Sequence, residues 1–143
     1  MKKAIVIGGK TINMGTIKET ITKAQQAPQA VGPYSLAVKT GDFVFTAGQL
    51  GLDAESGSLV EGGIQAQTKK ALENLCAVLK EAGSDISLVV KTTVFLQHIS
   101  DFTAMNEVYA TFFKTEPPAR SAVEVAALPK GGLVEIEAVA LLK

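Results

Sequence analysis

Apolar and polar positions alternate regularly over most of this chain, and the period of the alternation predicts its elements. Residues 35–39 and 43–47 are rich in apolar and β-branched side chains and flank a short glycine-containing turn, which predicts a β-hairpin. Over residues 64–82 apolar positions recur every three or four residues, as they do along one face of a helix. Gly83 suits a left-handed C-terminal cap, and the lysines and glutamates of this stretch predict a solvent-facing side.

A second helix is predicted after a further strand. Residues 88–96 are rich in β-branched side chains and predict a central strand. Ser100 or Asp101 can cap the helix, and Pro117-Pro118 ends it because proline has no backbone N–H to donate. The apolar side of this helix carries Phe102, Met105, Tyr109, Phe112 and Phe113.

Strands at 121–128 and 133–142 complete the order ββαβαββ. The long stretches around each helix are typical of crossover connections, so we expect an α+β fold with a mixed sheet and two helices on one face. The central strand is nevertheless apolar on both of its faces. A second subunit is the natural cover for the other face, and the pattern therefore predicts a homo-oligomer.

The first 25 residues lack sustained periodicity, and we expect them to be an N-terminal appendage to a single domain over 26–143. Residues 4–7 fit an extra strand, a leader remnant or sequence added to the natural protein. The string Ile7-Gly-Gly-Lys-Thr11 resembles the end of a phosphate-binding loop. The glycine required five positions before Gly9 is Ala4, however, and no amphipathic helix follows at once, so no nucleotide site is predicted.

Charge and cysteine content narrow the function classes. Basic and acidic residues number 14 each, so no global charge favours nucleic acid or an anionic membrane. Cys76 and His98 are single, which excludes a disulfide within the chain and the usual side-chain zinc sites. We expect Cys76 in the core, His98 in a loop, no metal and no cofactor. A reducing compartment fits, so the cytoplasm is expected, or an organellar matrix if the appendage is a leader.

Two residues of the last segment stand out as candidates for chemistry. Arg120 follows a stiff Pro-Pro-Ala stretch, and its guanidinium can bind a carboxylate through two parallel hydrogen bonds. Glu135 and Glu137 share one face of the last strand with apolar residues, where a carboxyl group tends towards a raised pKa and can move protons. The ordinary alternatives are a surface arginine and an exposed or ion-paired strand edge.

Two further candidates lie near the first hairpin. Tyr34 ends the rigid tripeptide Gly32-Pro-Tyr, which would fix where its hydroxyl points, although an interface tyrosine fits as well. Gly48 follows the second strand and offers an unshielded backbone N–H to an anion, although a plain turn glycine fits as well.

A series of short motifs runs in a fixed order from residue 27 to residue 142. Together they resemble the RidA/YjgF (Rid) family of enamine/imine deaminases. The motifs are Ala27-Pro-Gln-Ala-Val-Gly-Pro-Tyr34, Phe45-Thr-Ala-Gly-Gln49, Val90-Lys-Thr-Thr-Val-Phe95, Asp101-Phe102 with Asn106 and Tyr109, Pro118-Ala-Arg-Ser121, Val123-Glu-Val-Ala126, Leu128-Pro-Lys130 and Ile136-Glu-Ala-Val139.

The resemblance implies a chorismate-mutase-like fold and a homotrimer with three sites in the clefts between subunits. It implies cofactor-free hydrolysis of reactive enamines and imines, such as 2-aminoacrylate, to 2-oxo acids and ammonia. By position, Arg120 matches the carboxylate-binding arginine, Glu135 the catalytic glutamate and Tyr34 a pocket tyrosine. Gly48 matches a backbone contact and Asn106 a polar residue near the site.

The chain departs from the commoner family pattern at two positions. Ala122 stands where many members have cysteine, and Ala47 where many have serine. Two other functions remain open. One is an endoribonuclease or translation inhibitor, against which the neutral net charge counts; the other is a non-catalytic protein that binds 2-oxo acids or amino-acid derivatives. The expected partner is a small imino or enamino acid rather than nucleic acid or a membrane.

Overall fold

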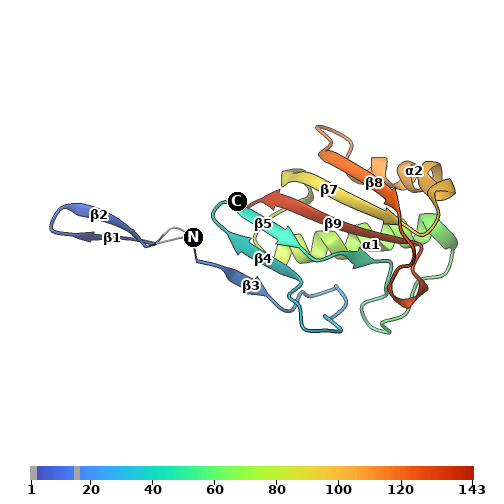
Figure 1. The fold of residues 1–143 in the computed structure, drawn as a ribbon, viewed down its shortest axis with the longest axis horizontal. Helices are drawn as coiled ribbons and strands as arrows, with labels where there is room; N and C mark the ends of the chain where they lie inside the picture. Colours follow the sequence, from blue (N-terminus) through green and yellow to red (C-terminus); the bar gives the residue numbers. More distant parts are fainter. Residues whose placement is uncertain (1–2, 15–16) are drawn as a thin grey trace.

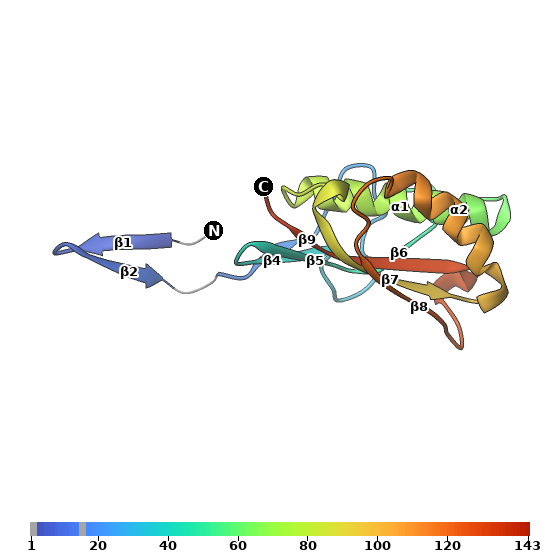
Figure 2. The ribbon, with the colours of Figure 1, turned by 90° about the horizontal axis from the view of Figure 1, so that it is seen from above.

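Helices α1 (Gly63–Glu81) and α2 (Phe102–Phe112) lie on one face of a seven-stranded sheet (Figures 1 and 2). The computed structural model describes residues 3–14 and 17–143. The strands of the sheet are β3 (Glu19–Ile21), β4 (Ala37–Thr40), β5 (Phe43–Thr46), β6 (Gln49–Leu50), β7 (Val89–Leu96), β8 (Ala119–Glu124) and β9 (Val134–Leu141). Three short 3-10 turns, 86–88, 99–101 and 129–131, connect them to their neighbours.

The strand order is β3-β4-β5-β9-β7-β8, and β6 pairs with β9 beyond the end of β5. Only β7 and β8 run parallel among these pairs; the others are antiparallel. The prediction of an α+β fold with a mixed sheet and two helices on one face is therefore confirmed. The predicted ββαβαββ series corresponds to β4, β5, α1, β7, α2, β8 and β9.

The N-terminal segment forms two kinds of structure. Strands β1 (Lys3–Ile7) and β2 (Lys10–Met14) pair with each other as a separate two-stranded sheet around the Gly8-Gly9 turn. Strand β3 also falls within the stretch expected to be an appendage, yet it pairs with β4 and extends the main sheet. The glycines that resembled part of a phosphate-binding loop therefore form a hairpin turn.

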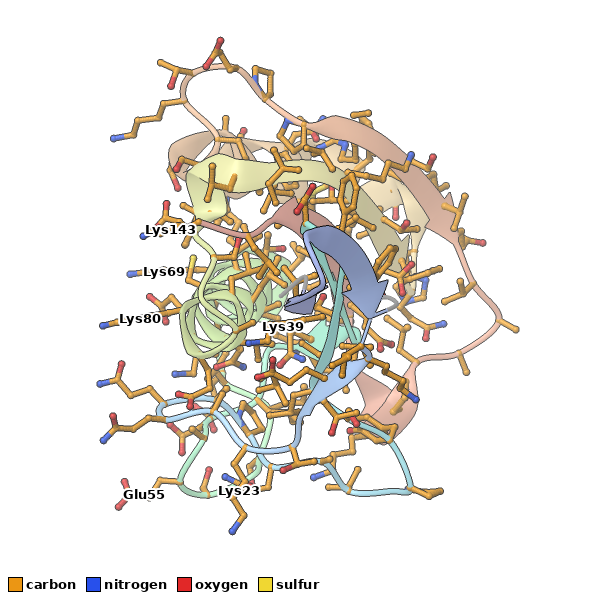
Figure 3. The ribbon with its side chains drawn as sticks, turned by 90° about the vertical axis from the view of Figure 1, so that its left-hand side faces the viewer. Lys23, Lys39, Glu55, Lys69, Lys80 and Lys143 are labelled. Carbon is orange, nitrogen blue, oxygen red and sulfur yellow. The ribbon has the colours of Figure 1, made fainter. Side chains whose placement is uncertain are left out.

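Helix α1 packs its apolar face on the sheet and ends where the periodicity predicts. Gly83 has a φ of 82°, the left-handed conformation expected after the last helical turn. Lys69 and Lys80 project away from the sheet, as their place between the apolar positions predicts (Figure 3). The side chains that the helix buries belong to Gln67, Thr68, Ala71, Leu72, Asn74, Leu75, Val78 and Leu79.

The face of the sheet opposite the helices exposes large apolar side chains. Phe43 and Phe45 of β5 and Leu141 of β9 are 36–46% exposed, and Phe43 pairs with Leu141 across the two strands. Val123 of β8 is exposed to a similar degree. We name Phe43, Phe45, Val123 and Leu141 the open-face cluster. Its exposure agrees with the expectation that another subunit covers this face, and the oligomeric state stays a prediction.

Two sequence expectations are wrong, one about the bounds of a strand and the other about the burial of Cys76. Strand β8 occupies 119–124 rather than 121–128, because its pairing partner β7 ends at Leu96, opposite Glu124. Cys76 is only partly buried instead of lying in the core. This burial, and to a smaller extent the nearby carboxylates of Asp85 and Glu73, raises the pKa of the Cys76 thiol to about 11.

In the described part of the chain, no helix is both long and apolar enough to cross a membrane.

Candidate active site

A cavity of about 370 Å³ lies beside the short strand β6 and contains three of the five predicted site residues. Tyr34, Gly48 and Glu135 all line it, and most of the other lining side chains are apolar. The remaining lining residues are Pro28, Gln29, Val31, Leu36, Ala47, Gln49, Leu50, Leu52, Pro129 and Lys130.

Glu135 is the acidic residue of this cavity. It lies on β9 opposite Leu50 of β6, and its side chain is half-buried. Burial raises the pKa of the Glu135 carboxyl group above its ordinary value, and the neighbouring carboxylate of Glu137 raises it further. A carboxylate whose pKa is raised holds a proton more tightly than an ordinary glutamate, and a stronger base of this kind suits general acid–base chemistry.

Gly48 leaves the space that the Glu135 side chain occupies. A Cβ atom at position 48 would lie 2.7 Å from Cδ and 2.8 Å from Cγ of Glu135, closer than real Cβ contacts allow. The backbone at Gly48 therefore forms part of the wall against which the carboxyl group rests. This close approach gives a structural reason for a glycine here beyond the turn itself.

Tyr34 forms another part of the cavity wall. Its backbone N–H donates to the carbonyl oxygen of Gly32 at 2.8 Å, and its hydroxyl oxygen accepts from the N–H of Val31 at 3.4 Å. The tight turn fixes the position of the ring, which stays 48% exposed. The hydroxyl proton can be donated to a molecule in the cavity.

Arg120 and Asn106 belong to a second group of residues at α2. The guanidinium of Arg120 stacks over the ring of Tyr109, 4.6 Å from its centroid, and lies 5.4 Å from that of Phe102. Asn106 is one helical turn from both aromatic residues and so shares their face of α2. Burial raises the pKa of Tyr109, against the opposing effects of its hydrogen bond with Thr92 and of Arg120.

The two groups lie on opposite faces of the sheet. Arg120 pairs with Thr92 of β7, whose hydroxyl lies 2.7 Å from that of Tyr109 on the helix face. Glu135 pairs with Phe95, three residues further along β7, and an odd number of residues reverses the face. With two strand spacings between them as well, the Cα atoms of Arg120 and Glu135 are roughly 14 Å apart. One subunit therefore cannot bring both side chains to one small molecule.

Comparison with known proteins shows the family to which the chain is related. A family model described as Endoribonuclease L-PSP, the RidA/YjgF family, matches residues 24–142. The chain belongs to this family. It is 48% identical over 128 residues to human 2-iminobutanoate/2-iminopropanoate deaminase, which covers 90% of this chain and 93% of the human protein.

Solved structures of family members have the same fold. RidA from an Antarctic Psychrobacter superposes with a TM-score of 0.82 at 47% identity, over 87% of this chain and 99% of that protein. Escherichia coli TdcF with bound serine also gives 0.82, at 39% identity over 87% of this chain and all of TdcF. The fold expected from the sequence resemblance is thus confirmed.

Ala122 and Ala47 depart from the residues that the resemblance to the Rid family implies, and both fit their surroundings in the structure. Ala122 of β8 packs against the core cluster on the helix face, two residues from Arg120. Ala47 lines the Glu135 cavity, so a methyl group stands where the sequence resemblance implies a hydroxyl. Both changes make their surroundings more apolar and leave Arg120 and Glu135 in place.

Lys130 is a cavity residue that the sequence reasoning did not assign. It has a φ of 56°, and its ammonium group donates to the carbonyl oxygen of Gly57 at 2.8 Å. The motif Leu128-Pro-Lys130 was its only sequence signal.

In the described part of the chain, no cluster of three or more His, Cys, Asp or Glu side chains is arranged to hold a metal ion.

Gly48→Ala is expected to displace the Glu135 side chain. The added methyl group overlaps the end of the Glu135 side chain, which is flexible and should turn towards solvent. The pKa of its carboxyl group should then fall towards the ordinary value, with little loss of folding stability. Carbon-13 NMR titration measures this pKa. Gly32→Ala is the control, because its Cβ would make an ordinary contact at 3.5 Å with the Tyr34 ring. Equal pKa values of Glu135 in the two variants would contradict the close packing.

The raised pKa of Glu135 also predicts a pH-dependent effect on stability. The folded protein binds the carboxyl proton more tightly than the unfolded chain, so this group's favourable contribution is complete below the ordinary glutamate pKa of about 4.3. It is lost as pH rises through the higher folded pKa. Glu135→Gln should therefore raise the melting temperature at neutral pH, with a gain that shrinks towards pH 4. A gain that grows on acidification would show that the pKa is lowered instead.

Proposed function

We propose that this chain is an imine deaminase of the Rid type, which hydrolyses 2-imino acids and 2-aminoacrylate-type enamines to 2-oxo acids and ammonia. The observation that carries the proposal is the half-buried Glu135 carboxyl group, with its raised pKa, resting against Gly48 in a largely apolar cavity. The names of the 48–49% identical mammalian relatives, 2-iminobutanoate/2-iminopropanoate deaminases, support the substrate class.

The active site in this proposal is built by two subunits of a homotrimer. One subunit supplies Glu135, Tyr34 and the backbone at Gly48, and its neighbour supplies Arg120 and Asn106. This division follows from the opposite faces on which the two groups lie. The open-face cluster gives the neighbouring subunit an apolar surface to bury.

Arg120 positions the substrate in this mechanism. Its guanidinium donates two parallel hydrogen bonds to the carboxylate of the imino acid. The rings of Tyr109 and Phe102, over which the guanidinium lies, hold it in position. The Tyr34 hydroxyl and the backbone N–H at Gly48 fix the other end of the molecule. Such positioning removes much of the entropic barrier to attack by water.

Glu135 moves the protons. As a carboxylate it accepts a proton from a water molecule, whose oxygen forms a bond to the imine carbon while the C=N π electrons move to nitrogen. The protonated Glu135 then returns the proton to nitrogen, which gives a carbinolamine. Glu135 next carries the hydroxyl proton to the amino nitrogen, the C–N bond breaks, and ammonia leaves as the C–O bond becomes the carbonyl of the 2-oxo acid. An enamine first gains a proton on its terminal carbon and loses one from nitrogen, which converts it to the imine.

The experiment that tests this function generates the imine in place. An amino-acid oxidase converts an amino acid to its imine, and release of 2-oxo acid or ammonia is followed with and without the protein. Acceleration above spontaneous hydrolysis, for several amino-acid precursors, is the expected result. A rate equal to that of the buffer for all precursors would refute the proposal.

The description of the matching family model favours testing a second function, RNA cleavage. The equal numbers of acidic and basic residues count against it, because RNA binding draws on clustered positive charge. Cleavage that survives stringent purification, weakens with salt and persists in Arg120→Ala would support a ribonuclease. We expect no such cleavage.

A further inference from the structure

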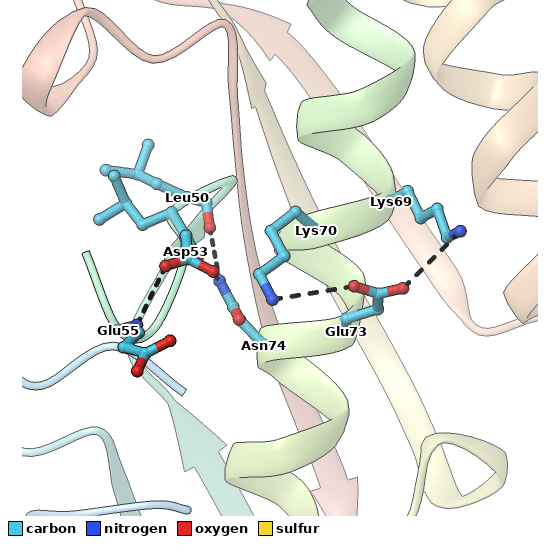
Figure 4. A network of polar contacts seen from close by, with 8 residues as sticks. Leu50, Asp53, Glu55, Lys69, Lys70, Glu73 and Asn74 are labelled. Atoms are coloured by element: carbon cyan, nitrogen blue, oxygen red, sulfur yellow. Dashed lines mark hydrogen bonds and ion pairs between the residues drawn. The ribbon is translucent and has the colours of Figure 1, made fainter. Parts of the chain in front are cut away.

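Two amide side chains of α1 bond to the backbone around Glu135, one at β6 and the other at the residue that leads into β9. Asn74 is fully buried, and its Nδ2 donates to the carbonyl oxygen of Leu50 at 3.0 Å (Figure 4). It also donates to the carbonyl oxygen of Leu52 at 2.8 Å. Gln67 lies two helical turns earlier on the same face, and its Oε1 accepts from the backbone N–H of Leu133 at 2.9 Å.

These bonds reach the cavity walls directly. Leu50 and Leu52 line the cavity, and Leu50 is the cross-strand partner of Glu135. Leu133 precedes Glu135 by two residues and leads into β9. The contact between helix and loop is also tight, since a Cβ atom at Gly51 would lie 2.6 Å from Cα of Gln67.

Asn74 is a polar residue on the buried face of α1, where a polar side chain is unusual. Gln67, Ala71, Asn74 and Val78 recur on the buried stripe of α1, where apolar residues pack best. Asn74 Oδ1 is buried with no hydrogen-bond partner among the described residues. A buried acceptor without a hydrogen bond lowers the stability of the fold. The two hydrogen bonds that Asn74 donates to carbonyl groups offset this loss.

We propose that Asn74 and Gln67 are positioning residues for Glu135: they fix β6 and the start of β9 on α1 and so set the shape and dryness of the cavity. The inference rests on the proposed imine hydrolysis for its effect on turnover. Its effect on the Glu135 environment does not depend on that function. Loosening the loop would admit water to the carboxylate and reduce the desolvation that raises its pKa.

The test compares Asn74→Leu and Gln67→Met, both of similar size to the native residues, with the control Thr68→Val. Thr68 is equally buried on α1, but its hydroxyl has no partner among the described residues, so its replacement removes no bond. Imine turnover gives kcat and KM. Carbon-13 NMR titration, with the signal assigned by Glu135→Gln, gives the pKa of the Glu135 carboxyl group.

We expect the two amide variants to lower kcat about tenfold or more with little change in KM, since misplacing a catalytic group acts on the chemical step. The pKa of Glu135 should fall towards its ordinary value in both, and neither quantity should change in Thr68→Val. If Asn74→Leu fails to fold, the less buried Gln67→Met decides. Folded amide variants with the parental Glu135 pKa and kcat would overturn the inference. If the parent does not hydrolyse imines, the proposed function fails and the NMR result alone decides.

Discussion

Arg120→Ala should lower kcat/KM for imino-acid hydrolysis by about 100- to 1,000-fold, the loss expected for a bidentate charge-assisted pair with a substrate carboxylate. The alanine variant cannot orient the substrate, so both KM and kcat should suffer. The coupled imine assay measures the change directly. Turnover at the parental level would remove Arg120 from the site.

Arg120→Lys separates charge from geometry. Lysine keeps the positive charge but lacks the planar fork, so its activity should fall between those of the parent and the alanine variant. A purely structural arginine, stacked on Tyr109 and Phe102, would behave differently. In that case the alanine variant would lose about 0.5–1 kcal/mol of stability and keep its turnover.

Glu135→Gln should abolish most of the turnover while leaving ligand binding intact. Removing a general acid–base typically costs about 100- to 10,000-fold in rate, and glutamine fills the same space beside Gly48. Isothermal titration calorimetry with a 2-oxo acid, such as pyruvate, measures binding separately from turnover. The parent and the glutamine variant should bind with similar affinity.

This separation also decides between an enzyme and a non-catalytic binding protein. A sensor for 2-oxo acids would need Arg120 but not a proton carrier, so Glu135→Gln would change little. Glu137→Gln is the matched comparison, because Glu137 lies on the same face of β9 but does not line the cavity. Its replacement removes only the smaller of the two causes that raise the pKa of Glu135, so it should cost far less turnover than Glu135→Gln. Equal turnover in the two variants would exclude the proposed role of Glu135.

Mixing the two inactive variants tests the division of the site between subunits. If Arg120 and Glu135 meet across a subunit boundary, random reassembly of equal amounts of Arg120→Ala and Glu135→Gln should restore about a quarter of the sites. Each restored site takes its glutamate from the first variant and its arginine from the second. If both side chains served one site within a subunit, mixing would restore none.

Much of the fold was predictable because its signals are local. The apolar period of residues 64–82 and Gly83 define α1 without knowledge of any partner. Strand β6 carries no comparable signal: it is two residues long and exists because β9 continues past the end of β5. The bounds of β8 likewise depend on where β7 ends.

Candidate site residues could be selected from the sequence, but their arrangement in space could not be predicted from it. Motif positions identified Tyr34, Gly48 and Glu135, which the cavity brings together. The separation of Arg120 from Glu135 depends on which residues of β7 each strand faces, and nothing local in the sequence encodes that register. The amides of Asn74 and Gln67 did leave a signal, as polar residues within an apolar helical stripe.

The opposite orientation of Arg120 and Glu135 has a consequence for how much activity a given amount of protein provides. In the proposed assembly each chain contributes halves of two different sites, and an isolated chain completes neither. Catalytic capacity then belongs to the associated fraction and follows the law of mass action. Near the dissociation constant of the assembly, halving the protein would more than halve the rate.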